Sequence, residues 1–294
     1  MNMYTDEQLI DMYTERRYKR WVKQKIKLRV RLMLIFLLLF INIILVFILI
    51  FNRDECECLD VNNCLEISNI EENVEEYEYE EEYVNVIPGR YAFLTFDDGP
   101  SVYTQKILDV LNNKNAPAIF FVQGESINNR SDAREILNLI LEEGHYIGLH
   151  TMSHDHDILY RGEGAPQRFV NEMFELDQLI YEMTGFSTNL CRAAYGMARN
   201  FTPEHHVAVD RAGLYCIDWN IDSRDWEQRT AYMVYQNVTN QIEGLDFPDE
   251  LVILFHEHLW TAEALPGIID YLRLHGYTIA VYNPGDILIY YRFR

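Results

Sequence analysis

The ten residues 91–100, YAFLTFDDGP, join an apolar run to two adjacent carboxylates and a turn signal. The apolar run is typical of a buried strand. Asp97 and Asp98 therefore come where the strand ends, just before the turn-forming pair Gly-Pro. In α/β barrels, catalytic side chains gather at the carboxyl ends of the strands. The two carboxylates are therefore as compatible with a functional site as with an ordinary turn.

Strand-like and helix-like segments alternate from Arg90 onward. The apolar runs that predict strands are Tyr91 to Phe96, Ala118 to Val122, Tyr146 to His150, Leu190 to Arg192, Leu214 to Trp219, Leu251 to His256 and Thr278 to Val281. The amphipathic stretches that predict helices include Val102 to Asn112, Arg134 to Glu143, Gln167 to Thr184 and Ala262 to His275. This alternation predicts an α/β fold with a parallel sheet and right-handed crossovers. A length of about 200 residues favours a (β/α) barrel or distorted barrel, with an open doubly wound sheet as the alternative.

The composition allows one large domain with appendages. The 294 residues are 49% hydrophobic and 13% aromatic, which is ample for a core. The formal net charge is -21, although residues 1–31 hold nine Lys or Arg against four acids. The chain after this basic segment is thus strongly acidic, and nucleic acid is not expected as a partner.

An uncharged span, residues 32–51, follows the basic segment and reads LMLIFLLLFINIILVFILIF, with Asn42 as its one polar residue. A run of this length can cross a hydrocarbon layer of roughly 30 Å, so it predicts a transmembrane helix. It lacks the shorter core and small-residue exit of a cleaved signal peptide and is expected to stay as an anchor. Because positive flanks stay in the cytoplasm, we expect a single-pass protein of the cell membrane, with residues 1–31 cytoplasmic and the main domain extracellular.

Residues 52–88 have the composition of an acidic extracellular stalk. Nine Glu lie between positions 66 and 83, a density that repels itself and lacks a core pattern. The stalk also contains three cysteines, whose odd number allows no assigned pairing: Cys56, Cys58 and Cys64. Cys191 and Cys216 lie in apolar stretches of the main domain, where buried free thiols are expected.

The stretch HTMSH begins with His150 and ends with His154, directly after a predicted strand. Two imidazoles four positions apart can converge on one metal ion when the segment turns helically. A zincin protease would need Glu at the second position, where this chain has Thr151. Taken alone, such a pair is more often two solvated histidines than a metal site.

Five motifs occur in one order, each at or just after the end of a predicted strand: TFDDGP (95–100), HTMSH (150–154), RAAYG (192–196), DSRDW (222–226) and LFH (254–256). The series resembles the polysaccharide deacetylases of carbohydrate esterase family four, whose domain is the NodB homology domain. The resemblance covers residues 89–294, and FFVQG at 120–124 is similar to the family's second strand. The third motif of the family usually reads Arg-x-Pro-Tyr-Gly, and here Ala194 replaces the proline. This change loosens a loop beside the site but removes no reactive group.

The resemblance implies a divalent metal ion held by Asp98, His150 and His154, with Zn2+ expected and Co2+ as the alternative. Three protein ligands and one open position are what hydrolytic zinc chemistry needs. Asp97 would be the base that takes a proton from the attacking water. The charge of the metal would relieve the repulsion between the two carboxylates.

The resemblance also implies roles for residues of the later motifs. Arg192 would hold Asp97 ionised through a charge-assisted hydrogen bond. His256 would be the general acid that protonates the leaving nitrogen, and Asp225 would raise its pKa by pairing with the imidazolium.

Three residues are expected to contact the substrate. The backbone N–H of Tyr195 would bind the oxyanion together with the metal. Trp226 and Leu254 would form an apolar wall for the acetyl methyl group.

The expected function is a metal-dependent hydrolase that removes N-acetyl groups from cell-wall polysaccharide, above all from N-acetylglucosamine of peptidoglycan. Family members with this anchored layout resemble peptidoglycan deacetylases of Gram-positive bacteria, and an amine leaving group needs the proton that His256 would give. Two alternatives stay open: an O-acetyl esterase acting on xylan or another acetylated glycan, and a glycan-binding pseudoenzyme without turnover. The sequence does not predict the oligomeric state.

Overall fold

The structure, a computed structural model, describes residues 89–283. The predicted cytoplasmic segment, transmembrane helix and acidic stalk, together residues 1–88, lie outside the described residues, as do residues 284–294. Within the described part, none of the helices combines the length and apolar character that a membrane crossing requires.

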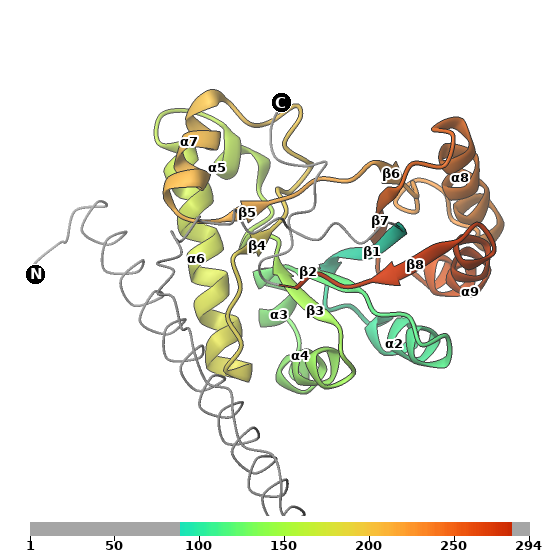
Figure 1. Cartoon of the computed structure of the whole chain (residues 1–294). Helices are drawn as coiled ribbons and strands as arrows, with labels where there is room; N and C mark the ends of the chain where they lie inside the picture. Colours follow the sequence, from blue (N-terminus) through green and yellow to red (C-terminus); the bar gives the residue numbers. More distant parts are fainter. Residues whose placement is uncertain (1–88, 284–294) are drawn as a thin grey trace, which may run out of the picture. The chain divides into compact units, whose positions relative to one another are not determined.

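One curled parallel sheet organises the described part of the chain (Figure 1). Its strands are β1 (Arg90–Gly99), β2 (Ile119–Val122), β3 (Tyr146–Leu149), β4 (Leu190–Cys191), β5 (Tyr215–Cys216), β6 (Ile221–Asp222), β7 (Glu250–His256) and β8 (Tyr277–Ala280). Their order is β5-β4-β3-β2-β1-β7-β6, and β8 pairs with β1 beside this path. The edge strands β5 and β6 do not pair with each other in residues 89–283, so the sheet is a half-barrel. The predicted distorted (β/α) barrel is confirmed.

Strand β1 brings the expected motifs to one edge of the sheet. It pairs in parallel with β7, where Asp97 lies opposite His256, and with β2, where Asp97 lies opposite Phe121. The amino-terminal part of β1 also pairs with β8, from Arg90 opposite Tyr277 onward. Because all these strands run in the same direction, their carboxyl ends and the loops that follow them meet at one edge.

The alternation of side chains along β1 separates an apolar face from the face that bears the site. Phe96 stacks on Phe120 and Phe255 of the neighbouring strands, with ring centroids 5.1 and 5.4 Å apart, and all three are fully buried. Phe93 lies on the opposite face, in a second buried cluster. Since residues two apart in a strand share a face, Asp97 extends from the face of Phe93.

The helices surround the sheet (Figure 1). They are α2 (Thr104–Asn113), α3 (Gly124–Asn128), α4 (Ala133–Glu142), α5 (His156–Tyr160), α6 (Ala165–Thr184), α7 (Pro203–Arg211), α8 (Ala231–Gly244) and α9 (Leu259–Leu274). Neighbours around the outside pack in the order α8, α9, α2, α4, α6, and α5 and α7 pack on α6. Of these, α3, α5, α7 and α8 were not among the predicted helices.

One predicted strand is wrong in extent. The run Leu214 to Trp219 forms a strand only at Tyr215–Cys216, and the chain then crosses to the other edge of the sheet as β6. Asn220 determines this crossing. Its side chain donates to the carbonyl of Glu250 at 2.8 Å and accepts from the N–H of Val252 at 2.8 Å, which binds the segment to β7 instead of prolonging β5.

The two cysteines of the main domain lie on adjacent strands. Cys191 of β4 is opposite Cys216 of β5 in the sheet register. Both are buried and both are free thiols, as the apolar sequence around them predicts. Burial, followed by the contact with Cys191, raises the pKa of Cys216 well above its ordinary value, so its thiol stays protonated.

Candidate active site

A break in the strand pattern brings two consecutive carboxylates into the same cleft. In a regular strand, Asp97 and Asp98 would point to opposite faces of the sheet. The pairing register of β1 shifts between Asp97 and Gly99, and Asp98 has a left-handed backbone with φ of 69°. This bulge turns Asp98 so that both carboxylates line the cleft.

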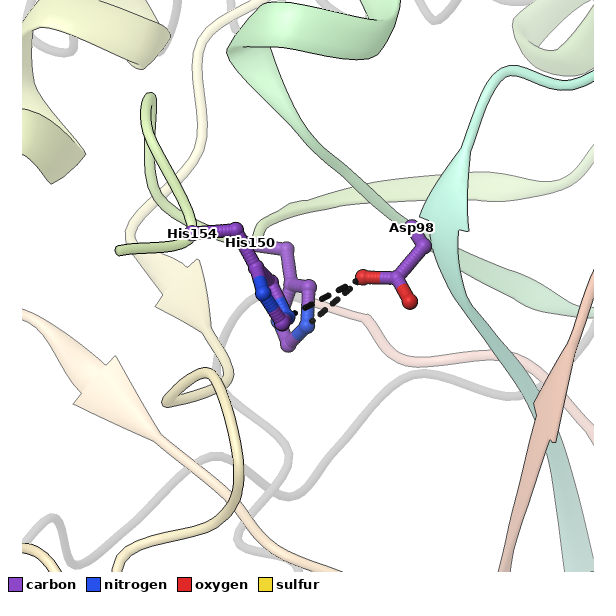
Figure 2. A group of neighbouring side chains, drawn as sticks. All are labelled: Asp98, His150 and His154. Atoms are coloured by element: carbon purple, nitrogen blue, oxygen red, sulfur yellow. Dashed lines mark ion pairs between the residues drawn. The ribbon is translucent and has the colours of Figure 1, made fainter. Parts of the chain in front are cut away.

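Asp98 faces two imidazoles (Figure 2). Its Oδ1 lies 3.4 Å from Nε2 of His150 and 3.3 Å from Nε2 of His154. The three potential ligand atoms lie within 4.8 Å of one another, and Oδ1 is buried without a well-formed hydrogen bond. Two imidazole nitrogens and one carboxylate oxygen around a buried point, open on the cleft side, are the donor set of a catalytic zinc site. These residues therefore fit a divalent metal ion.

Hydrogen bonds on the far side of each ring orient the histidines. Nδ1 of His150 lies 3.0 Å from the backbone carbonyl of Arg192, so it must carry the proton and donate it. The Tyr195 hydroxyl donates to the carbonyl of His154 at 3.0 Å and lies 3.2 Å from Nδ1 of that residue. Because the hydroxyl has only one hydrogen, it accepts from Nδ1. Both rings consequently present the lone pair of Nε2 to Asp98.

The charges of this group favour a cation. Burial acts to raise the pKa of Asp98, but the close contact with His150 and the charges of the surrounding imidazoles hold it well below its usual range. Burial and the charge of His150 lower the pKa of His154, so His154 is neutral and can serve as a ligand. Burial acts to lower the pKa of His150, but Asp97 and Asp98 raise it above its ordinary value. A proton and a metal ion would compete for this nitrogen.

Asp97 is buried and paired with an equally buried arginine. Nη1 of Arg192 donates to Oδ1 of Asp97 at 2.9 Å and to the hydroxyl of Thr95 at 2.6 Å. Nη2 donates to the carbonyl of Asp218 at 3.0 Å, and the guanidinium lies 4.2 Å from the centroid of the Phe121 ring. The free oxygen of the carboxylate, Oδ2, therefore faces the imidazole pair, 3.8 Å from Nε2 of His150.

His256 is held by a second buried carboxylate. Oδ1 of Asp225 lies 2.8 Å from its Nδ1, and Oδ2 accepts from its backbone N–H at 2.7 Å and from the Thr261 hydroxyl at 2.7 Å. Burial alone would lower the pKa of His256, but the hydrogen bond and charge of Asp225, with smaller effects of Asp97 and Asp98, raise it to about 9. Nε2 of His256 points to the group formed by Asp98, His150 and His154, and it lies 3.9 Å from Oδ2 of Asp98. His256 can therefore hold a proton beside the reacting atoms at neutral pH.

A cleft of about 830 Å³ connects these groups. It is lined by eight of the ten expected site residues, namely Asp97, Asp98, His150, His154, Tyr195, Trp226, Leu254 and His256. The other two, Arg192 and Asp225, lie behind it and contact Asp97 and His256. Trp226, 55% exposed, and Leu254, only 4% exposed, both line the cleft. The backbone N–H of Tyr195 makes no hydrogen bond within residues 89–283.

Several residues that shape the site were missed by sequence reasoning. Asp218 accepts from the N–H of Met197 at 3.0 Å and so fixes the turn that follows Tyr195. Glu257 binds the loop after Asp98, and Glu172 binds the loop before His154. An acid inside an apolar run could have pointed to Asp218 and Glu257. Glu172 lies on an amphipathic helix and has no such signal.

Comparison with known proteins identifies the family. The family model described as polysaccharide deacetylase matches residues 85–215, a range that includes the first three motifs. A peptidoglycan-N-acetylglucosamine deacetylase of Bacillus cereus is 34% identical over 202 residues, covering 66% of this chain and 70% of that protein. The chain belongs to the polysaccharide deacetylase family.

Two further relatives of the deacetylase family agree with this assignment. The putative polysaccharide deacetylase YheN of Bacillus subtilis is 33% identical over 193 residues, which are 65% of this chain and 66% of that protein. The crystal structure of the polysaccharide deacetylase Bc1974 from Bacillus cereus aligns with a TM-score of 0.60 and 31% identity, covering 66% of this chain and 92% of that one. The family expected from the five motifs is thus confirmed, and with it the class of enzyme, a hydrolase that deacetylates polysaccharides.

Proposed function

We propose that this chain is a metal-dependent hydrolase that removes N-acetyl groups from cell-wall polysaccharide, with N-acetylglucosamine of peptidoglycan as the substrate. The observation that carries the proposal is the convergence of three features on one cleft. These are the potential ligand atoms of Asp98, His150 and His154, the carboxylate of Asp97 paired with Arg192, and the imidazole of His256, whose pKa is raised by its pairing with Asp225. The choice of sugar is supported by relatives that are named peptidoglycan-N-acetylglucosamine deacetylases.

Asp98, His150 and His154 would hold the metal, with Zn2+ proposed and Co2+ as the alternative. A divalent metal bound there supplies Lewis-acid chemistry, which makes water nucleophilic near neutral pH. Asp97 then takes a proton from the attacking water through the oxygen that Arg192 leaves free. Arg192 orients this carboxylate and donates to its other oxygen.

His256 gives its proton to the leaving nitrogen. An amine is a poor leaving group unless it is protonated, whereas the alcohol of an ester leaves more readily. The pKa of about 9 keeps His256 charged at neutral pH, and Asp225 holds the ring so that Nε2 faces the cleft. This acid is the reason to prefer an N-acetyl over an O-acetyl substrate.

The remaining cleft residues bind the acetyl group. The N–H of Tyr195 is available to donate to the oxyanion, because no group in residues 89–283 accepts from it. The buried side chain of Leu254 and the exposed ring of Trp226 provide an apolar wall for the methyl group.

Acetate release from three substrates tests the function. The zinc-loaded protein is expected to release acetate from N-acetylglucosamine oligomers and from peptidoglycan. Acetate from acetylxylan but from neither N-acetylated substrate would instead identify an O-acetyl esterase. A protein that binds these glycans and releases no acetate from any of them would be the pseudoenzyme.

We also propose that the catalytic domain faces outward from the cell membrane, because a basic segment precedes the uncharged span 32–51. A stalk formed by residues 52–88 would let the domain reach at most roughly 120 Å from the bilayer. Protease added to intact cells should therefore release a soluble fragment that begins near the end of the stalk. Full protection of the domain in intact cells, with cleavage after lysis, would reverse the proposed orientation.

A further inference from the structure

The loop that carries His154 has a backbone conformation that its sequence does not favour. This ligand loop, residues 151–155, connects β3 to α5. Thr151 and His154 have φ values of 65° and 54°, in the left-handed region that residues other than glycine rarely adopt. A β-branched threonine is especially unfavourable there. The loop bonds itself in part, since the N–H of His154 donates to the Thr151 hydroxyl and that of Asp155 to the Ser153 hydroxyl, both at 3.1 Å. Contacts from outside the loop add to these bonds and hold the unfavourable conformation.

The carbonyl groups of the ligand loop are bound from one side by helix α3. The N–H of Gly124 donates to the carbonyl of Thr151 at 3.0 Å, and the N–H of Glu125 donates to that of Met152 at 2.9 Å. Gly124 lies so close that a Cβ atom there would be 2.9 Å from Cα of Met152. This side of the loop is thus fixed by backbone contacts.

Two N–H groups of the loop are bound by one carboxylate. Oε2 of Glu172, on α6, accepts from the N–H of Met152 and from the N–H of Ser153, both at 3.0 Å. Its Oε1 accepts from the Ser153 hydroxyl at 2.7 Å. Hydrogen bonds to a charged acceptor are stronger than those between neutral groups. Glu172 is therefore the side chain from outside the loop that satisfies its backbone donors within residues 89–283.

We propose that Glu172 is a positioning residue for the metal site, which holds the ligand loop in the conformation that presents Nε2 of His154 to Asp98. Within residues 89–283, no hydrogen bond or ion pair joins Glu172 to Asp98, His150 or His154, so it acts through the loop. The inference rests on the proposed function in one respect, since it requires that Asp98, His150 and His154 bind a divalent metal.

The expected effect is on metal affinity. Without the carboxylate, the N–H groups of Met152 and Ser153 can bind water, and other conformations of the loop become populated. Metal binding would then also have to order the loop, so the apparent affinity falls in proportion to the competent fraction. Residues that orient metal ligands typically change metal affinity by about 10- to 100-fold when they are removed.

Three variants of the full-length chain test the proposal. In Glu172→Ala, zinc affinity measured by competition with a chelator should fall about tenfold or more. Glu172→Gln should retain most of the affinity, because one amide oxygen can accept from both backbone N–H groups. The matched control is Glu175→Ala, an exposed acid on the same helix, which should bind zinc like the wild type. Thermal unfolding of the metal-free proteins establishes that each variant is folded.

Equal zinc affinity in Glu172→Ala and the wild type would overturn the proposal. So would an equal loss in Glu172→Gln and Glu172→Ala, since the charge and not the hydrogen bonds would then matter. If Glu172→Ala does not fold, Ser153→Ala decides. It removes one of the three bonds to Glu172, together with the bond that the Ser153 hydroxyl accepts from the N–H of Asp155. Zinc binding should weaken a few-fold, and unchanged affinity would count against the proposal. A wild-type chain that binds no zinc would instead refute the proposed function, and this failure is visible without any variant.

Discussion

Arg192 donates from Nη1 to Oδ1 of Asp97 over 2.9 Å, although the two residues lie 95 positions apart in the chain. Both side chains are buried, with exposed fractions of 0% and 4%. The same guanidinium also binds the hydroxyl of Thr95 and the carbonyls of Ile217 and Asp218. It therefore joins β1, β4 and the segment after β5 while it orients the proposed base.

Removal of Arg192 is expected to lower the stability of the fold and to reduce the activity. Arg192→Met leaves the carboxylate of Asp97 buried without its partner, which should cost about 3–5 kcal/mol in urea unfolding. Asp97→Asn in the Arg192→Met background should recover part of this loss, because the uncompensated charge is gone. Arg211→Met, on the exposed side of α7, serves as the control and should change stability by less than about 0.5 kcal/mol. A loss in Arg192→Met no larger than in this control would contradict the interpretation.

Substitutions of the two adjacent carboxylates, Asp97 and Asp98, are expected to impair different properties of the enzyme. Asp97→Asn should reduce acetate release from N-acetylglucosamine oligomers by about 100-fold or more, because the proposed base is lost, and it should change zinc affinity little. Asp98→Asn should weaken zinc binding, because a charged ligand becomes neutral. Acetate assays and chelator competition on both variants measure the difference. If the two variants lost zinc to the same extent, the proposed division between ligand and base would be wrong.

The alkaline limb of the pH profile should depend on Asp225. His256 can donate a proton only below its pKa, which Asp225 raises to about 9. Amide cleavage should therefore fall as the pH rises through this region. In Asp225→Asn the pKa of His256 is lower, so the limb should move to lower pH.

The profile of kcat/KM against pH in the wild type and the variant measures this shift. Asp222→Asn is the matched control, since Asp222 belongs to the same motif and binds the N–H of Arg224 instead of His256. Its alkaline limb should coincide with that of the wild type. If the alkaline limb of the Asp225→Asn profile stayed at the wild-type pH, a group other than His256 would determine it.

Gly99 is expected to tolerate no side chain. A Cβ atom at this position would overlap Oε1 of Glu257 and lie 2.7 Å from its Cδ. The carboxylate of Glu257 accepts from the N–H of Ser101 at 2.8 Å and from the hydroxyl of Thr104, so it cannot move without losing these bonds. Gly99→Ala should therefore destabilise the protein by about 1–3 kcal/mol in urea unfolding.

Gly244→Ala provides the comparison. A Cβ atom at position 244 would meet no atom within 4 Å, and the backbone there is helical. This variant should be neutral or more stable by up to about 1 kcal/mol. Equal stability of the two alanine variants would show that Glu257 does not restrict position 99.

The parts of the fold that were predicted depend on local sequence. The apolar run of β1 and the alternation of strands and helices indicate a parallel sheet, because each strand needs a covering helix before the next parallel strand. Since catalytic groups gather at the carboxyl ends of such strands, the motifs that follow them could be assigned to one site. The ten expected site residues are therefore in or directly behind one cleft.

Elements with weak local patterns were not predicted. Helix α7 has the polar sequence PEHHVAVDR, which lacks an apolar periodicity, although it begins with Pro203 and with a local capping box between Thr202 and His205. Its packing against α6 is the tertiary contact that supports it. Strand β6 has two residues, and its place beside β7 depends on Asn220. In these segments tertiary contacts outweigh intrinsic propensity.

Residue types and local periodicity are enough to identify the reactive groups and the strand ends that carry them. The distant groups that support them follow from the folded arrangement of the chain. Glu172 meets the loop of His154 because α6 packs against β3, and Arg192 meets Asp97 because β4 and β1 belong to one curled sheet. Such contacts depend on the path of the chain between the residues, and no local pattern around either partner encodes that path.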